Sequence, residues 1–271
     1  MRILFLGDVM GRTGRDAVCA QLPRLKADLL ADFAVVNGEN AAGGYGLNRK
    51  IAADLQAAGA DIVTTGNHVW DQREFLSEID SLPYVLRPLN LSGFAPGKGI
   101  GTVEKNGRKL TVIHAMGQLG MGGAMTDHPF TAIDAALTQH PLGPQGILID
   151  FHAEMTSEKM AMGHFADGRA SLVVGTHTHV PTGDAQILPG GTAYQTDAGM
   201  CGDYDSVIGM NKSDAVFRMH KRLPTMNKMK PADGPPTLCG VLVVTDDKTG
   251  LAVEIHPLRI GGRLQQSNPA A

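Results

Sequence analysis

Five short apolar runs, each ending in small or polar residues, constrain the fold of this 271-residue chain most strongly. Runs of this kind are typical of buried strands that lead into loops. Between the early runs, residues 15–30 and 49–58 have the apolar spacing of helices. The alternation of strands and helices predicts an α/β fold rich in parallel strands. The five runs are ILFLGD, FAVVNGEN, DIVTTGNH, ILIDFHAE and SLVVGTHTH.

Two turn signals add antiparallel strands to this parallel set. Asn106-Gly107 separates TVEK from KLTVIHA, and a turn at residues 247–250 separates LCGVLVVT from LAVEIHPL. An Asn-Gly pair between two apolar runs is a strong hairpin signal. We therefore expect mixed sheets in a single domain that covers residues 1–271. Residues 116–125 and 211–236 are expected to form long loops with some helix.

Charge and cysteine content limit the partners and the location of the protein. The formal net charge is −3 and both signs are interspersed, so no basic surface is expected for a long nucleic acid or an anionic membrane. Cys19, Cys201 and Cys239 lie far apart without CxxC spacing, which argues against a disulfide framework or a zinc ribbon. The first apolar run is broken at Asp8, and no later run is long enough to cross a bilayer. We expect a cytoplasmic protein.

Polar side chains follow each of the five predicted strands. Ligands of open α/β sheets bind beyond the carboxyl ends of the strands, where side chains from several strands converge. Oxygen and imidazole donors without cysteine are typical of a site for Mn, Fe, Mg or Zn. The donors at the strand ends are Asp8, Glu39, Asn40, Asn67, His68, Asp150, His152, His177 and His179.

The spacing and chemistry of these donors suit one or two metal ions. If His177-Thr178-His179 is extended, both imidazoles point to the same side and reach one metal or two neighbouring metals. The carboxylate of Glu39 is able to bridge two cations, and Asn67 is able to bind through its amide oxygen without adding charge.

Each donor also has an ordinary structural explanation. An aspartate such as Asp8 is often a helix N-cap, and asparagines such as Asn40 and Asn67 are often turn residues in the left-handed region. His152, which follows an apolar strand, taken alone is best explained as a buried core histidine. The coincidence of donors at all five strand ends favours a metal site over these separate explanations.

The glycines around Asp8 raise a further alternative, a loop that binds a nucleotide phosphate. No Gly-Lys-Ser/Thr follows Gly7, Gly11 and Gly14, which excludes a Walker A loop. Gly7-Asp8-Val9 also lacks the second glycine of a dinucleotide fingerprint. We therefore interpret these glycines as residues that let the chain turn sharply beside Asp8.

In order, the motifs GDVMG, NGEN, GNHVWD, DFHAE and GTHTHVPTGD resemble those of the calcineurin-like metallophosphoesterase superfamily, and their wording resembles its YmdB-like branch. The resemblance extends from Asp8 to about Asp205 and includes QTDAGMCGDYDSVIGM. It implies an α/β/β/α fold in which two mixed β-sheets are sandwiched between helices. Two departures stand out: Asp8 lacks the histidine that usually follows two positions later, and Glu39 replaces the usual bridging aspartate.

The resemblance also implies a centre of two metal ions, with Fe or Mn as the first choice and Mg or Zn as alternatives. One metal would be bound by Asp8, Glu39, Asn40 and His179, and the second by Glu39, Asn67, His152 and His177. His68 matches the histidine that faces the substrate and acts as the general acid. For Asp71 we expect a helix N-cap before QREFL rather than a contact that orients His68.

The reaction implied by the resemblance is hydrolysis of a phosphodiester by a hydroxide that the two metal ions activate. Cyclic nucleotides are the implied substrates, with 2′,3′-cyclic nucleoside monophosphates and 3′-phosphate products first and 3′,5′-cyclic nucleotides second. Two alternatives stay open: a phosphomonoesterase or 5′-nucleotidase on the same site, and a metal-dependent regulatory or binding module whose hydrolysis is incidental. The resemblance further predicts a homo-oligomer.

Overall fold

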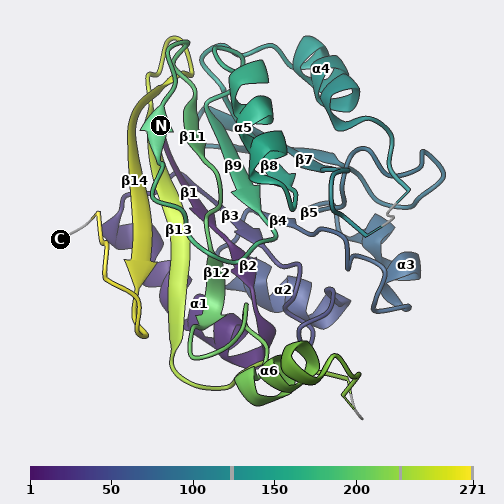
Figure 1. Ribbon diagram of the computed structural model, residues 1–271. Coiled ribbons are helices and arrows are strands. Elements are labelled where there is room, and N and C mark those ends of the chain that lie inside the picture. Colours follow the sequence, from purple (N-terminus) through teal and green to yellow (C-terminus); the bar gives the residue numbers. More distant parts are fainter. Residues whose placement is uncertain (123–124, 226–227, 270–271) are drawn as a thin grey trace.

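The computed structural model describes residues 1–122, 125–225 and 228–269 of the protein. Two mixed β-sheets pack against each other between two layers of helices, as predicted (Figure 1). All five predicted strands and both predicted hairpins are present.

The first sheet combines the early parallel strands with the last hairpin. The order is β2 (Asp8–Val9), β12 (Met200–Asp203), β13 (Pro236–Thr245), β1 (Arg2–Leu6), β3 (Phe33–Asn37), β4 (Ile62–Thr64) and β5 (Val85–Leu86), with β14 (Ala252–Ile260) beside β13. The strands from β1 through β3 and β4 to β5 are parallel, as are β2 and β12. Strand β13 pairs antiparallel with β1, β12 and β14.

The second sheet is built around the central strands of the chain. The order is β10 (Gln186–Ile187), β11 (Ala193–Gln195), β9 (Leu172–Thr176), β8 (Gly146–His152), β7 (Arg108–Met116) and β6 (Ile100–Lys105). Strands β7, β8, β9 and β11 are parallel. Asn106 and Gly107 both have positive φ, 50° and 74°, as a two-residue turn between β6 and β7 requires.

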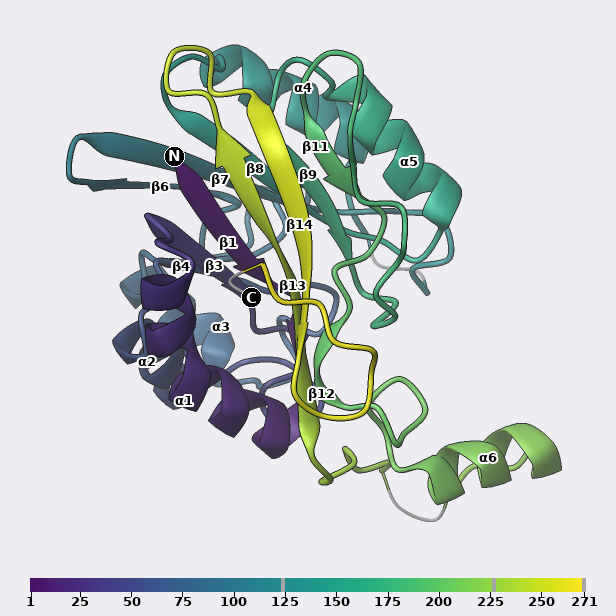
Figure 2. The same ribbon diagram turned by 90° about the vertical axis from the view of Figure 1, so that its left-hand side faces the viewer.

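Helices cover the outer face of each sheet (Figure 2). The first sheet is covered by α1 (Gly11–Asp28), α2 (Arg49–Ala57) and the short α3 (Phe75–Glu78), which continues into a 3₁₀ turn at Ile79–Ser81. The second sheet is covered by α4 (Pro129–Gln139) and α5 (Thr156–Phe165). The remaining helix, α6 (Lys212–Lys221), projects from the body beyond β12. Within the described ranges, no helix has the length and apolar character needed to cross a membrane.

The alternation of side chains along β1 explains why its run is apolar throughout. Ile3 and Phe5 belong to the core between the two sheets, whereas Leu4 and Leu6 belong to the core between the first sheet and its helices. A strand that is covered on both faces has no polar face. A third apolar cluster joins the second sheet to α4 and α5.

The two predicted loops are only partly described. In the first, Met116 is the last residue of β7 and not a loop residue, and Gly123 and Ala124 lie outside the described residues. The second contains α6, in agreement with the predicted helix, and Met226 and Asn227 lie outside the described residues.

The glycines near Asp8 have two different roles. Gly11 has φ 62° at the first residue of α1, which agrees with a sharp turn and lets the helix begin four residues before the predicted position 15. A Cβ on Gly7 would lie 1.8 Å from the carbonyl oxygen of Gly199, and one on Gly14 would lie 2.0 Å from that of Cys201. These two glycines therefore let the segment around β12 pack directly against the connection from β1 to α1.

Candidate metal centre

The predicted donors from both sheets meet at the carboxyl ends of the parallel strands. Among the predicted metal ligands, the first sheet supplies the carboxylates and amides, and the second sheet supplies the three imidazoles. His152 Nε2 lies 3.7 Å from Glu39 Oε1, and His179 Nε2 lies 3.7 Å from Asp8 Oδ1. Asp8 is in β2, Glu39 and Asn40 follow β3, Asn67 and His68 follow β4, His152 ends β8, and His177 and His179 follow β9.

The hydrogen bonds of His152 determine which ring nitrogen faces this centre. Thr176 Oγ1 donates to Asp150 Oδ1 across 2.7 Å, so it accepts the Nδ1–H of His152 across 2.9 Å. A neutral imidazole with a protonated Nδ1 carries its lone pair on Nε2. That Nε2 lies 2.9 Å from Asn67 Oδ1, an oxygen that only accepts hydrogen bonds.

His177 presents a second lone pair to the same point. Its Nε2 lies 3.1 Å from Glu154 Oε2, and a carboxylate accepts the N–H there. The lone pair of His177 is then on Nδ1, which lies 3.1 Å from His152 Nε2. Two ring nitrogens and the Asn67 oxygen thus converge as acceptors. Such acceptors repel each other unless a cation or a proton lies among them.

His179 and Asn40 form a second group of candidate metal ligands beside Asp8. The Nδ1–H of His179 donates to the carbonyl oxygen of Ile208 across 2.8 Å, and a carbonyl oxygen only accepts, so the lone pair of His179 is on Nε2. This nitrogen lies 3.0 Å from Asn40 Nδ2. The contacts therefore divide the predicted ligands into a His179 group and a His152–His177 group.

The two carboxylates each have one oxygen without a hydrogen-bond partner among the described residues. Asp8 Oδ2 accepts the backbone N–H of His177 at 3.2 Å, and Glu39 Oε1 accepts that of His68 at 2.6 Å. The buried oxygens Asp8 Oδ1 and Glu39 Oε2 have no such partner. Burial raises the pKa of both carboxyl groups, and the charge of Asp197 raises the pKa of Asp8 further. A bound cation would reverse this effect by favouring the charged form.

The three imidazoles are in the protonation state that metal binding requires. Burial lowers the pKa of His152, His177 and His179, and that of His177 falls to about 4. Neutral imidazole is the form that binds metal ions. The buried donor set thus fits divalent cations: carboxylate and amide oxygens with neutral ring nitrogens.

The conformation of the His177–His179 segment differs from the extended one considered for the sequence. His177 and His179 follow the end of β9 with φ of 93° and 65°, in the left-handed region. Alternate residues of a strand would point to one side, but these two rings contact different groups of donors. The cost of two left-handed residues must be offset by the contacts that hold the segment.

A buried frame supplies those contacts. Asp197 accepts both the backbone N–H and the hydroxyl of Thr178, across 3.1 and 2.6 Å. Lys159 Nζ donates to the same carboxylate across 2.7 Å, and both charged groups are buried. The hydroxyl of Tyr204 donates to the carbonyl oxygen of His179 across 2.9 Å. Asp197 and Tyr204 belong to QTDAGMCGDYD, one of the motifs that carry the family resemblance. The sequence alone predicts no role for either residue.

Asp150 lies beneath the centre and connects the two sheets. The sequence places Asp150 among the donors at the strand ends. In the structure, its carboxylate accepts hydrogen bonds from Asn37 Nδ2 at 3.0 Å and Thr64 Oγ1 at 2.5 Å, both from the first sheet. Because Asp150 is in β8 of the second sheet, these bonds fix the sheets relative to each other. They also orient Thr176, and through it His152.

The predicted N-cap role of Asp71 is wrong. The short helix α3 begins at Phe75 with Glu74 at its N-cap and without a side-chain cap. Asp71 donates its backbone N–H to the carbonyl oxygen of His68 at 2.9 Å, and this turn folds its carboxylate back to 3.0 Å from His68 Nδ1. Asp71 therefore orients His68 through Nδ1 and leaves Nε2 outside this contact. The ring of Tyr45 packs edge-on against His68, with centroids 5.4 Å apart.

Among the described residues, no group of three or more histidine, cysteine, aspartate or glutamate side chains is already arranged to hold a metal ion. Two of the seven predicted ligands are asparagines, and one oxygen of Glu39 is bonded to the backbone of His68. The ligand roles therefore stay predictions.

Comparison with known proteins identifies the family. A family model described as YmdB-like protein matches residues 4–258. The chain belongs to the YmdB-like family. A Bacillus subtilis relative named 2′,3′-cyclic-nucleotide 2′-phosphodiesterase is 46% identical to this YmdB-like chain over 260 residues, which cover 96% of the chain and 97% of that protein.

Two solved structures agree with this assignment. One from Mycoplasma pneumoniae, described as a novel phosphatase, is 32% identical to the YmdB-like chain and has a TM-score of 0.89. The match covers 99% of the chain and 95% of that protein. The NAD nucleotidase of Haemophilus influenzae is 14% identical with a TM-score of 0.59, over 96% of the chain and 56% of that protein. At that identity the likeness shows the fold alone, which is the predicted calcineurin-like one.

Proposed function

We propose that this YmdB-like chain is a phosphodiesterase that depends on two divalent metal ions and hydrolyses 2′,3′-cyclic nucleoside monophosphates to 3′-phosphates. The observation that carries the metal part of the proposal is the convergence of three acceptors: His177 Nδ1 and Asn67 Oδ1 lie 3.1 and 2.9 Å from His152 Nε2. The name of the Bacillus relative supports the substrate.

The proposed ligands follow the two groups of contacts. Two bound divalent cations would supply a water of lowered pKa and neutralise the phosphoryl oxygens during in-line attack. Glu39 would lie between the cations: one of its oxygens accepts the His68 N–H, and the other is buried without a hydrogen-bond partner among the described residues. Asp8, Asn40 and His179 would bind on one side of Glu39, and Asn67, His152 and His177 on the other.

Residues around the ligands determine which atoms they present. Thr176 accepts a hydrogen bond from Nδ1–H of His152, and Glu154 accepts one from Nε2–H of His177. The carbonyl oxygen of Ile208 accepts one from Nδ1–H of His179. Each contact fixes a tautomer and so directs a lone pair toward the centre.

His68 is proposed to protonate the leaving oxygen. An alkoxide is a poor leaving group, so a nucleotide diester needs a general acid at the bond that breaks. Asp71 holds Nδ1–H, which leaves Nε2 to deliver the proton. The bond from the His68 backbone to Glu39 places this side chain at the edge of the centre.

The proposal is tested by metal removal combined with a substrate comparison. We expect chelation to abolish hydrolysis of bis(p-nitrophenyl) phosphate and 2′,3′-cyclic AMP, and Mn²⁺ or anaerobically added Fe²⁺ to restore it. If the site is that of a diesterase, the diester should be hydrolysed at least about tenfold faster than p-nitrophenyl phosphate, which has the same leaving group and differs in being a monoester. Turnover that survives chelation would contradict the metal part, and faster turnover of the monoester would favour a phosphomonoesterase.

A further inference from the structure

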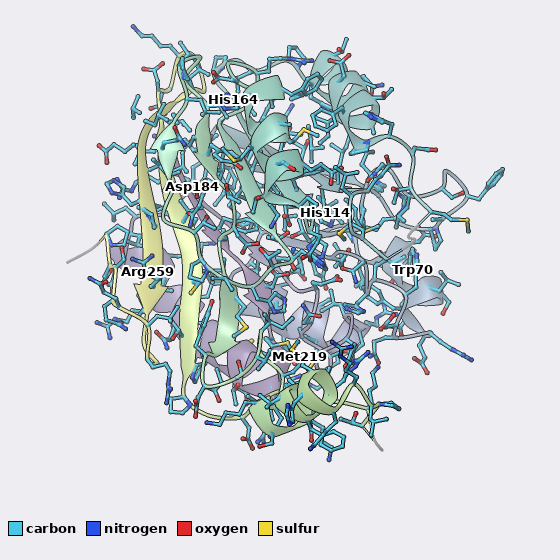
Figure 3. All side chains as sticks on the ribbon, in the orientation of Figure 1. Trp70, His114, His164, Asp184, Met219 and Arg259 are labelled. Carbon is cyan, nitrogen blue, oxygen red and sulfur yellow. The ribbon has the colours of Figure 1, made fainter. Side chains whose placement is uncertain are left out.

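A cavity of about 440 Å³ lies between α6 and the loop that follows β12. Its volume falls in the range of small-molecule sites, about 300–1,000 Å³. Met219, which Figure 3 labels, lies on α6 at the wall of this cavity. The lining residues used below are Ile208, Met210, Arg218, Met219, Arg222 and Met229.

The cavity shares a wall with the candidate metal centre. The carbonyl oxygen of Ile208, a lining residue, accepts the Nδ1–H of His179 at 2.8 Å. Met210, another lining residue, packs in one apolar cluster with Met10 and Met200. Met10 in turn forms a β-bridge with Asn40. The lining therefore contacts the proposed ligand His179 directly, and it is linked to Asn40 through Met210 and Met10.

Contacts of Tyr45 place the cavity on the side of His68. Tyr45 packs against His68 and belongs to the same methionine cluster as Met210. Met229, which lines the cavity, packs against the same cluster, and Lys228 Nζ lies 3.6 Å from the centroid of the Tyr45 ring. Because His68 is proposed to protonate the leaving oxygen, that oxygen would lie on the side of Tyr45, which is also the side of Met210 and the cavity.

The lining has the chemistry of a site for a nucleoside. Thioether and aliphatic side chains offer flat, adaptable contact to a base, and guanidinium groups stack on base faces. Arg218 and Arg222 supply two such guanidinium groups to the lining.

We propose that the cavity receives the nucleoside part of the substrate, with Met219 and Arg218 as determinants of specificity. This inference rests on the proposed function, because it takes the diester at the metal centre as its starting point. In a 2′,3′-cyclic nucleotide the bond that breaks joins phosphorus to the 2′-oxygen of the ribose, so the leaving oxygen belongs to the nucleoside, which stays attached to phosphorus through its 3′-oxygen. The nucleoside then extends from His68 past Tyr45 toward α6.

The test compares a substrate that has a base with one that has none. Met219→Trp would fill the cavity, and Met219→Leu would keep its volume. Val216→Trp is the matched control, because Val216 is exposed on the same helix and does not line the cavity. For the holoenzyme we expect Met219→Trp to lower the kcat/KM ratio of 2′,3′-cyclic AMP to bis(p-nitrophenyl) phosphate about tenfold or more, through KM. The other two variants should stay within about twofold.

Each outcome decides between separate claims. If the wild-type protein hydrolyses neither diester, the proposed function fails, and the inference fails with it. If the wild-type protein hydrolyses both and Met219→Trp leaves their ratio unchanged, the diesterase stands and the nucleoside site is overturned. An unchanged ratio with a loss of oligomers in sedimentation would assign the cavity to a second copy of the chain.

Arg218→Ala is a second variant that does not depend on a bulky substitution being tolerated. Its binding is measured calorimetrically with adenosine 3′-monophosphate and, separately, inorganic phosphate. We expect weaker binding of the nucleotide and unchanged binding of phosphate. An equal loss for both ligands, or no loss for either, would contradict a nucleoside site.

Discussion

Glu39→Gln is expected to leave at most one metal ion per chain and to lower kcat for diester hydrolysis by about 10³-fold or more. Glu39 is the one carboxylate proposed to lie between the cations, and its second oxygen is buried without a partner among the described residues. A neutral amide removes the charge that would hold two cations close together. Several kcal/mol of transition-state stabilisation by a metal pair correspond to about this change in rate. Metal content by mass spectrometry and steady-state kinetics measure the two effects.

Glu158→Gln is the matched control for this variant. Glu158 is also a buried glutamate, but its oxygens accept the backbone N–H groups of Gln118 and Leu119. We expect the Glu158→Gln variant to keep both metal ions, with or without a change in its thermal stability. If Glu39→Gln bound as much metal as Glu158→Gln and retained turnover, the bridging role of Glu39 would be wrong.

His68→Ala is expected to keep both metal ions and to lower kcat for 2′,3′-cyclic AMP by about 10²–10⁴-fold. For bis(p-nitrophenyl) phosphate the loss should be much smaller, because p-nitrophenolate leaves without a proton. Asp71→Asn should give a weaker form of the same pattern, since it loosens the 3.0 Å contact that orients His68 but keeps the ring. Equal losses for the two substrates would show that His68 acts on binding or metal retention and not as the acid.

The fold was predictable because the strands carry their own pattern. In β1, both faces are apolar since one lies against the second sheet and the other against helices. Asn106-Gly107 identified its hairpin because few residue pairs adopt positive φ so readily. The predicted start of α1, at residue 15, is wrong. The helix begins at Gly11, whose left-handed conformation is not evident from the amino-acid sequence.

The candidate site was predictable as a set of residues but not as an arrangement. Asp8, Glu39 and the three histidines stand at strand ends, and strand ends in such sheets converge. The left-handed conformation of His177 and His179 was not predictable, since it depends on Asp197 and Tyr204 some 20 residues later in the chain. Asp71 was misassigned for a related reason: a nearby helix start suggested a cap, whereas a turn returned its carboxylate to His68.

The central claim is that donors from the two sheets surround a pair of cations, and anomalous diffraction from crystals of the metal-loaded protein tests it most directly. Data collected above and below the Mn or Fe absorption edge are expected to show two peaks roughly 3.5–4 Å apart. One peak should lie beside Asp8 and His179, the other beside His152 and His177, and Glu39 should lie between them. A single peak, or peaks elsewhere on the chain, would contradict a paired metal centre at this position.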